Sequence, residues 1–157
     1  MRYSLLETPI GTLVLSGAAD GTVSSIDFTD GRGAPQPDGS WVRDDAAFAE
    51  ARAQLEAYFA GRLRQFALPL APTGTAFQQH VWQALGQIPY GSTRTYGQLA
   101  AALGAPRAMR AVGAANGRNP ISIVIPCHRL IGSDGSLTGY GGGLARKRWL
   151  LEFEGAR

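Results

Sequence analysis

The first 28 residues are divided into β-prone apolar runs by two turn signals. Pro9-Ile10-Gly11 and Asp20-Gly21 interrupt the stretch "RYSLLETPIGTLVLSGAADGTVSSIDF". Runs of this kind, bounded by such turn residues, are typical of strands joined by short connections. The pattern therefore predicts three antiparallel strands at the start of the chain.

A helical pattern follows, after a Gly/Pro-rich segment over residues 29–41 that has no period. In "DDAAFAEARAQLEAYFAG", Asp44 and Asp45 lie near the expected helix start and Gly61 ends it. The positions that recur at helical spacing are Phe48, Ala51/Arg52, Leu55, Tyr58 and Phe59. The extended piece "FALPLAPTGT" then leads into a linker. We place a domain boundary there, which gives an N-terminal domain over 1–71 and a C-terminal domain over 72–157.

The second half shows helical rather than strand-like patterning. "GTAFQQHVWQALGQI" carries apolar residues on one helical face, namely Phe77, Val81, Trp82 and Leu85. "LARKRWLLEFEG" predicts a last helix, whose expected buried side chains are Leu144, Trp149, Leu150, Leu151 and Phe153.

Two short helices between these have the proportions of a helix-turn-helix. The first is capped by Thr95 or Ser92 and closed by Gly104. The second has Pro106 at a plausible first position and ends at Asn116-Gly117.

The charge is unevenly distributed between the two halves. Residues 1–71 carry six Arg and nine Asp or Glu, and residues 72–157 carry nine Arg or Lys and three Asp or Glu. The halves thus have net charges of −3 and +6. A basic half suggests an anionic partner, although a solvated face would look the same.

Composition also limits the chain's surroundings. No apolar run approaches the roughly 20 residues of a membrane span, so we expect no membrane association. A single cysteine cannot form an internal disulfide, which fits a reducing cytoplasm. With one cysteine and two distant histidines, His80 and His128, the sequence predicts no metal site and no cofactor.

The lone thiol, Cys127, stands between Pro126 and His128 in "IVIPCHRLIG". A lone cysteine is most often a buried structural residue. A reactive one needs a neighbouring base or cation, and His128 could serve, with Glu154 on the last helix orienting it. Adjacent side chains point in different directions, so a water bridge or a short helix beginning at Pro126 would be required.

The second helix of the helix-turn-helix is unusually rich in small residues. Its sequence "RAMRAVGAANG" offers one long side chain in the middle, Arg110, among alanines and Gly113. Small residues cannot read base edges, but they let a helix approach the minor groove, which is about 6 Å wide. The alternative is a helix packed inside the protein with Arg110 at its rim.

Taken together, the motifs resemble the O6-alkylguanine-DNA alkyltransferase family, also called methylated-DNA–protein-cysteine methyltransferases. The resemblance is nearly continuous from Phe77 to Gly155 and includes "IPYGSTRTYGQLA", "RAVGAANGRNP", "IPCHR" and "TGYGGGLARKRWLL". The N-terminal segment is similar only in size and strand–helix order. The resemblance implies an α+β protein, with a small ribonuclease H-like α/β domain and a mainly helical, winged-helix-like domain.

The resemblance also implies a single-turnover reaction, in which Cys127 accepts an alkyl group from O6 of guanine, and with it from O4 of thymine, to repair DNA. His128 would take the thiol proton through a water and Glu154 would hold His128. Tyr96 would donate to the departing base, and Asn119 would support the thiol loop as a hinge. Arg129, beside the site, is expected to be structural.

The same resemblance assigns the DNA contacts. A flipped base would enter from the minor groove of double-stranded DNA, bound without sequence preference by a monomer. The residues expected to touch DNA are Arg110, Ala111, Gly113, Ala114, Tyr96 and Ser133. The substrate pocket would be formed by Tyr140, Gly141, Gly142 and Pro126. Gly141 stands where the family often has a larger residue, which suggests that the pocket accepts groups larger than methyl.

Three other functions remain open at this point. A cysteine hydrolase would use Cys127 and His128 but would need an oxyanion hole, and it would leave the small-residue helix without a purpose. A non-catalytic relative that only senses alkylguanine would lack the motif cysteine. A helix-turn-helix regulator should be dimeric and selective for sequence.

Overall fold

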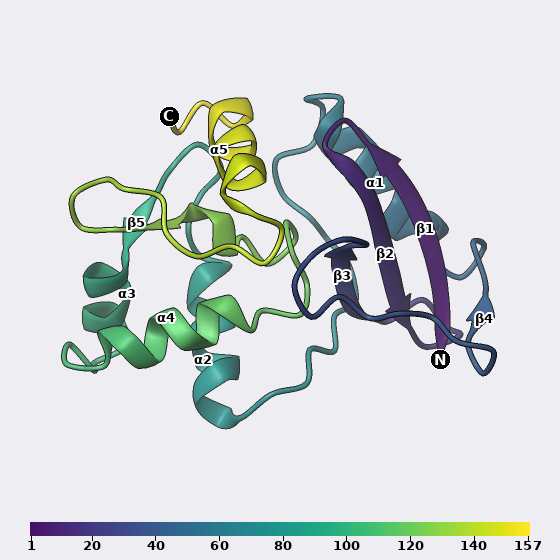
Figure 1. Ribbon diagram of the computed structural model, residues 1–157, viewed down its shortest axis with the longest axis horizontal. Coiled ribbons are helices and arrows are strands. Elements are labelled where there is room, and N and C mark those ends of the chain that lie inside the picture. Colours follow the sequence, from purple (N-terminus) through teal and green to yellow (C-terminus); the bar gives the residue numbers. More distant parts are fainter. The chain divides into compact units, whose positions relative to one another are not determined.

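The computed structural model describes all residues, 1–157, and the chain divides into two compact units, Met1–Pro72 and Thr73–Arg157. The first unit is built on a four-stranded sheet in the order β3-β2-β1-β4 (Figure 1). Its strands are β1 (Arg2–Thr8), β2 (Gly11–Gly17), β3 (Val23–Phe28) and β4 (Val42–Arg43). The three predicted antiparallel strands are confirmed, because β2 pairs antiparallel with both β1 and β3. The short β4 adds a parallel edge beside β1.

One helix, α1 (Ala49–Phe59), contributes to the core of this unit by burying Ala51, Leu55 and Tyr58. It begins later than the sequence pattern suggested. The Asp44 carboxylate accepts a hydrogen bond from the Ala47 amide, and residues 45–48 form a turn before the helix starts.

The extended piece before the linker pairs with the sheet. The Val23 amide donates to the Pro69 carbonyl (2.9 Å) and the Ala71 amide donates to the Val23 carbonyl (2.8 Å). Leu70 thus forms a parallel bridge to Val23, which ties the end of the first unit to β3.

The second unit is mainly helical. It contains α2 (Ala76–Leu85), α3 (Tyr96–Ala102), α4 (Met109–Gly117) and α5 (Leu144–Phe153), and a 3-10 turn at Cys127–Arg129. Two short strands, β5 (Arg94–Thr95) and β6 (Leu130–Ile131), pair in parallel. None of the helices is both long enough and apolar enough to cross a membrane.

Two threonines fix where helices start in this unit. Thr75 and Thr95 each accept a hydrogen bond from the amide three residues later, and the glutamines at those positions bond back. These reciprocal caps satisfy amides that the first helical turn would leave unpaired. Of the two cap candidates for α3, the structure selects Thr95. The α3–α4 pair is the helix-turn-helix, and α2 packs on α4 through a hydrogen bond from Trp82 Nε1 to the Ala115 carbonyl (2.9 Å).

Two further details of the sequence interpretation were wrong. Helix α4 begins at Met109, not at Pro106, because the Ala108 amide bonds to the Ala105 carbonyl and closes a separate turn first. On α5, Leu144 is 49% exposed, and Trp149 and Phe153 are only half-buried, with their rings stacked on each other. The buried face of α5 instead includes Lys147 with Leu150 and Leu151.

Candidate functional site

The segment that leads to the thiol is folded into consecutive tight turns. The Val124 amide donates to the Ser122 carbonyl and the Cys127 amide donates to the Ile125 carbonyl, both at 2.8 Å. Between the first pair, Ile123 has a φ of 73° and is the only non-glycine residue with a positive φ. A β-branched residue rarely adopts this conformation, which costs on the order of 1–3 kcal/mol. The surrounding contacts must therefore hold the segment in place.

Asn119 supplies part of that support. Its side-chain oxygen accepts from the Ile121 amide (3.0 Å) and its amide group donates to the Ile125 carbonyl (2.8 Å). Asn119 is buried, so these bonds hold the two ends of the loop without competition from water. The structure thus brings Asn119 to the thiol loop.

Cys127 begins the 3-10 turn and is buried together with His128 and Arg129. His128 is 0% exposed, and its Nε2 lies 2.8 Å from Oε2 of Glu154. Because a carboxylate can only accept, we assign the imidazole hydrogen to Nε2. The other ring nitrogen, Nδ1, has no hydrogen-bond partner in the protein and is buried. It is therefore the nitrogen available to accept a proton from the thiol side.

Burial lowers the pKa of His128 below its usual value. Glu154 opposes this shift, while the positive charges of Arg129 and Lys147 add to the lowering. The imidazole is consequently neutral near pH 7, the form that a general base needs.

Arg129 fixes the position of the carboxylate. Its guanidinium donates to both oxygens of Glu154, at 2.8 Å to Oε1 and 3.0 Å to Oε2, and a third bond reaches the Ile88 carbonyl at 2.8 Å. Such a bidentate pair is stronger and more directional than a single contact. Arg129 is therefore structural, as expected from the sequence, and it acts on Glu154.

Lys147 on α5 was not predicted from the sequence to belong to the site. Its side chain is buried, and its ammonium donates to the carbonyls of Leu130 (2.6 Å) and Thr138 (2.8 Å). Burial lowers its pKa to about 8, and the charge of the Cys127 thiolate opposes that shift. One signal could have singled it out, because Lys147 is the only lysine among fifteen basic residues.

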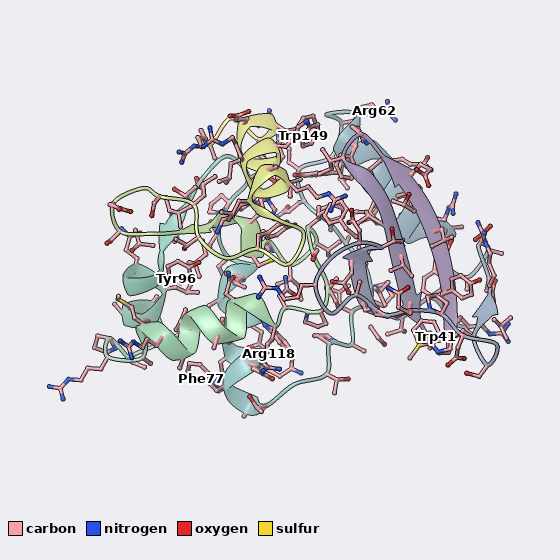
Figure 2. The ribbon with its side chains drawn as sticks, in the orientation of Figure 1. Trp41, Arg62, Phe77, Tyr96, Arg118 and Trp149 are labelled. Carbon is pink, nitrogen blue, oxygen red and sulfur yellow. The ribbon has the colours of Figure 1, made fainter.

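Tyr96 is the first residue of α3, and Figure 2 labels it at that end of the helix. It is half-buried, and its ring lies next to Gly113, where an added Cβ would come within 3.6 Å of it. On α4, Arg110, Ala111 and Ala114 are exposed. The alternative in which this face is packed inside the protein is excluded, since the buried face is formed by Val112, Ala115 and Asn116.

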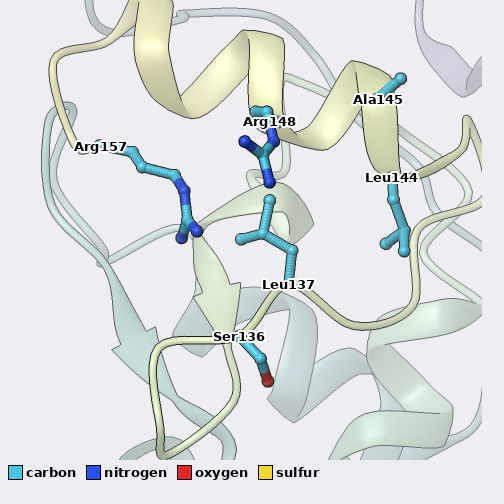
Figure 3. A pocket seen from close by; sticks show the side chains of 6 residues that line it. All are labelled: Ser136, Leu137, Leu144, Ala145, Arg148 and Arg157. Carbon is cyan, nitrogen blue, oxygen red and sulfur yellow. The ribbon is translucent and has the colours of Figure 1, made fainter.

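Of the predicted pocket residues, Tyr140, Gly141 and Gly142 lie in the loop between β6 and α5, as does the predicted DNA contact Ser133, and Pro126 directly precedes the 3-10 turn. Tyr140 and Pro126 are buried, Gly142 is half-buried, and Gly141 and Ser133 are exposed. A hollow of about 340 Å³ opens between this loop and α5 (Figure 3). It is lined by Ser136, Leu137, Leu144, Ala145, Arg148 and Arg157, so it includes neither the thiol nor any predicted pocket residue.

His80 is exposed, and no group of three or more His, Cys, Asp or Glu residues is placed to hold a metal ion. The chemistry available at the site is that of a cysteine beside a neutral histidine, which a carboxylate and an arginine hold in place. The fold and this site define a two-unit protein whose helix-turn-helix unit carries a buried cysteine beside a neutral histidine.

Family models place the chain more narrowly. Residues 76–156 match the DNA binding domain of 6-O-methylguanine DNA methyltransferase, and residues 1–72 match its ribonuclease-like domain. The chain belongs to the 6-O-methylguanine DNA methyltransferase family.

Named relatives cover the whole chain. A methylated-DNA–protein-cysteine methyltransferase from Methanosarcina acetivorans is 51% identical over 156 residues, covering 99% of each chain. The protein of that name from Mycobacterium leprae is 54% identical over 149 residues, covering 95% of this chain and 89% of the relative. Both halves of the chain are therefore shared with these proteins, including the N-terminal segment that sequence motifs alone left weakly assigned.

Solved structures agree. The Mycobacterium tuberculosis OGT structure, determined in complex with DNA, has a TM-score of 0.91 and 49% identity, covering 99% of this chain and 94% of that one. The O6-methylguanine-DNA methyltransferase of Pyrococcus kodakaraensis has a TM-score of 0.72 and 27% identity, covering 98% of both chains. The α+β architecture predicted from the sequence is confirmed.

Proposed function

We propose that this protein repairs DNA by moving an alkyl group from O6 of guanine to the sulfur of Cys127. The observation that carries this proposal is the buried Nδ1 of His128, the residue next to Cys127. Nδ1 has no hydrogen-bond partner in the protein, while Glu154 holds Nε2 of the same ring. The family and the names of the relatives support the same chemistry.

The reaction is a displacement at a saturated carbon. The thiol proton passes to His128 Nδ1 through a water. The water is needed because the side chains of the adjacent residues Cys127 and His128 point in different directions. The thiolate then forms the new S–C bond while the C–O6 bond breaks and leaves its electron pair on the guanine. Tyr96 gives its hydroxyl hydrogen to the departing base, and the proton that left the thiol restores the Tyr96 hydroxyl, so that guanine gains one proton in total.

The product is a thioether, which water does not hydrolyse readily. Each molecule therefore acts once. Asn119 holds the thiol loop during the attack, and Lys147 supplies a positive charge near the thiolate. Residues 72–157 bind DNA and accept the alkyl group, and residues 1–71 form the separate α/β domain.

DNA is bound through the minor groove by the exposed face of α4. Ala111, Gly113 and Ala114 let the helix backbone come close, and Arg110 fills the stack from which the base is flipped. Ser133 contacts a backbone phosphate, and Tyr96 contacts the flipped base. Because no base edges are read, binding has no sequence preference and weakens with salt.

The alkyl group is held among Tyr140, Pro126, Gly141 and Gly142. With no side chain at Gly141, the pocket takes groups larger than methyl, and alkylated O4 of thymine is a second substrate. The protein works as a monomer in the reducing cytoplasm, where the nucleophilic thiol stays reduced.

The deciding experiment is to weigh the protein after incubation with duplex DNA that contains O6-methylguanine. We expect the mass to rise once, by one methyl group replacing one hydrogen, and Cys127→Ser to remain unchanged. A protein that binds this DNA without gaining mass would be a sensor, and the proposal would be wrong.

A further inference from the structure

The hydroxyl of Tyr96 and the ammonium of Lys147 meet at one residue of the pocket loop, Thr138. The Tyr96 hydroxyl donates to the Thr138 carbonyl at 3.1 Å, and Lys147 Nζ donates to the same oxygen at 2.8 Å. In return, Thr138 Oγ1 donates to the Tyr96 hydroxyl oxygen at 3.1 Å. Thr138 thus accepts the hydrogen of the Tyr96 hydroxyl through its carbonyl and donates to the hydroxyl oxygen through Oγ1.

This arrangement conflicts with the task proposed for Tyr96. A phenol has one hydrogen to donate, and without DNA that hydrogen is committed to the Thr138 carbonyl. Before Tyr96 can donate to the flipped base, the hydrogen must leave this acceptor. The carbonyl remains satisfied afterwards, because Lys147 still donates to it. The Thr138 carbonyl therefore keeps one hydrogen-bond partner after the phenol hydrogen has turned to the base.

The hydrogen bond from Thr138 Oγ1 to the Tyr96 hydroxyl oxygen can persist during the reaction. When the phenol hydrogen turns to the base, Thr138 Oγ1 can continue to donate to the phenol oxygen. A donor on that oxygen stabilises the negative charge that builds there as Tyr96 gives up its hydrogen to the departing guanine. The hydroxyl also restricts the orientation of Tyr96, whose ring already packs against Gly113.

We propose that Thr138 is a positioning residue for alkyl transfer, whose hydroxyl polarises Tyr96 and whose carbonyl holds the Tyr96 hydrogen until the base arrives. The inference rests on the proposed function, and it adds a residue that the sequence motifs did not single out. Thr138 itself touches neither the thiol nor the reacting carbon in this scheme.

The test uses single-turnover kinetics on duplex DNA with O6-methylguanine, over a range of DNA concentrations. Thr138→Val removes the hydroxyl and keeps the backbone carbonyl that binds Lys147. We expect the maximal rate to fall about 2- to 12-fold, the equivalent of one neutral hydrogen bond. The DNA concentration at half-maximal rate should stay the same, and Thr138→Ser should restore the rate.

A double-mutant cycle separates this role from a structural one. In Tyr96→Phe protein, which has no phenol hydroxyl, Thr138→Val should have no further effect on the maximal rate. The inference is wrong if Thr138→Val slows the Tyr96→Phe protein as much as it slows the wild type. It is also wrong if Thr138→Val leaves the maximal rate of the wild type unchanged.

Failure of the function itself would look different. If wild-type protein gains no mass from the DNA, the proposed reaction fails before Thr138 is tested. If wild-type protein reacts and Tyr96→Phe reacts as fast, Tyr96 is not the donor and the inference falls while alkyl transfer to Cys127 stands.

Discussion

The Glu154 carboxylate offers the sharpest test of how the site is held together. It is fully buried as a side chain and accepts from His128 Nε2 at 2.8 Å and from the Arg129 guanidinium at 2.8 and 3.0 Å. In Glu154→Gln, one of the two oxygens becomes an NH₂ group. That group can only donate, so it faces another donor at Arg129 or at His128.

The expected loss of stability follows from these contacts. Removing one partner of a buried ion pair leaves Arg129 as an uncompensated buried charge, which typically costs about 3–5 kcal/mol. The effect on the reaction has a separate cause. An NH₂ group beside His128 Nε2 favours the tautomer with hydrogen on Nδ1, which can no longer take the thiol proton. Losing a general base typically slows a reaction about 10²- to 10⁴-fold.

Urea unfolding followed by tryptophan fluorescence measures the first effect, and the single-turnover transfer rate measures the second. The matched control is Glu152→Gln on the same helix, which changes an exposed carboxylate in the same way. That variant should stay within about 0.5 kcal/mol of the wild type. A Glu154→Gln protein that unfolds within about 1 kcal/mol of the wild type and transfers at its rate would refute the assigned roles of Glu154 and of His128.

Four further outcomes are expected. Asn119→Ala strands the Ile121 amide and the Ile125 carbonyl and should lower the free energy of unfolding by about 2–5 kcal/mol; an unchanged urea midpoint would contradict the hinge role. Burial depresses the pKa of His128 in the folded protein, whereas in the unfolded chain this histidine takes up a proton below a pKa of about 6.5. The free energy of unfolding should therefore fall as the pH drops through that value. If a His128→Gln variant shows the same dependence of stability on pH, His128 is not the cause. Arg110→Ala should slow repair of duplex DNA more than reaction with the free alkylated base, and equal slowing would mean that Arg110 does not fill the stack. O6-benzylguanine should react at least as readily as O6-methylguanine in DNA, and a strict methyl preference would show that Gly141 does not widen the pocket.

Local sequence determined much of this protein. The turn residues after Thr8 and Ala19 divide the first strands, and threonine caps followed by glutamine three residues later start α2 and α3. These features depend on residues a few positions apart, so they can be read from a single sequence. The motif around Cys127 likewise identified the thiol and its histidine, and the small choice of acidic residues together with the family resemblance pointed to Glu154 near the chain's end.

What only the tertiary structure decided depends on residues that are far apart in the chain. The two bonds from Arg129 to Glu154 span 25 positions, and the two bonds between Tyr96 and Thr138 span 42 positions. The face of α5 was predicted from hydropathy to bury Leu144, yet Lys147 is buried there, because two backbone carbonyls from other segments satisfy its ammonium. Sequence periodicity reports how apolar a position is, whereas burial of a charge depends on the partners that the fold brings to it. For the same reason the sequence could name Cys127, His128 and Glu154 but not their arrangement. Arg129 fixes the Glu154 carboxylate, the carboxylate accepts from His128 Nε2, and Nδ1 is left for the thiol.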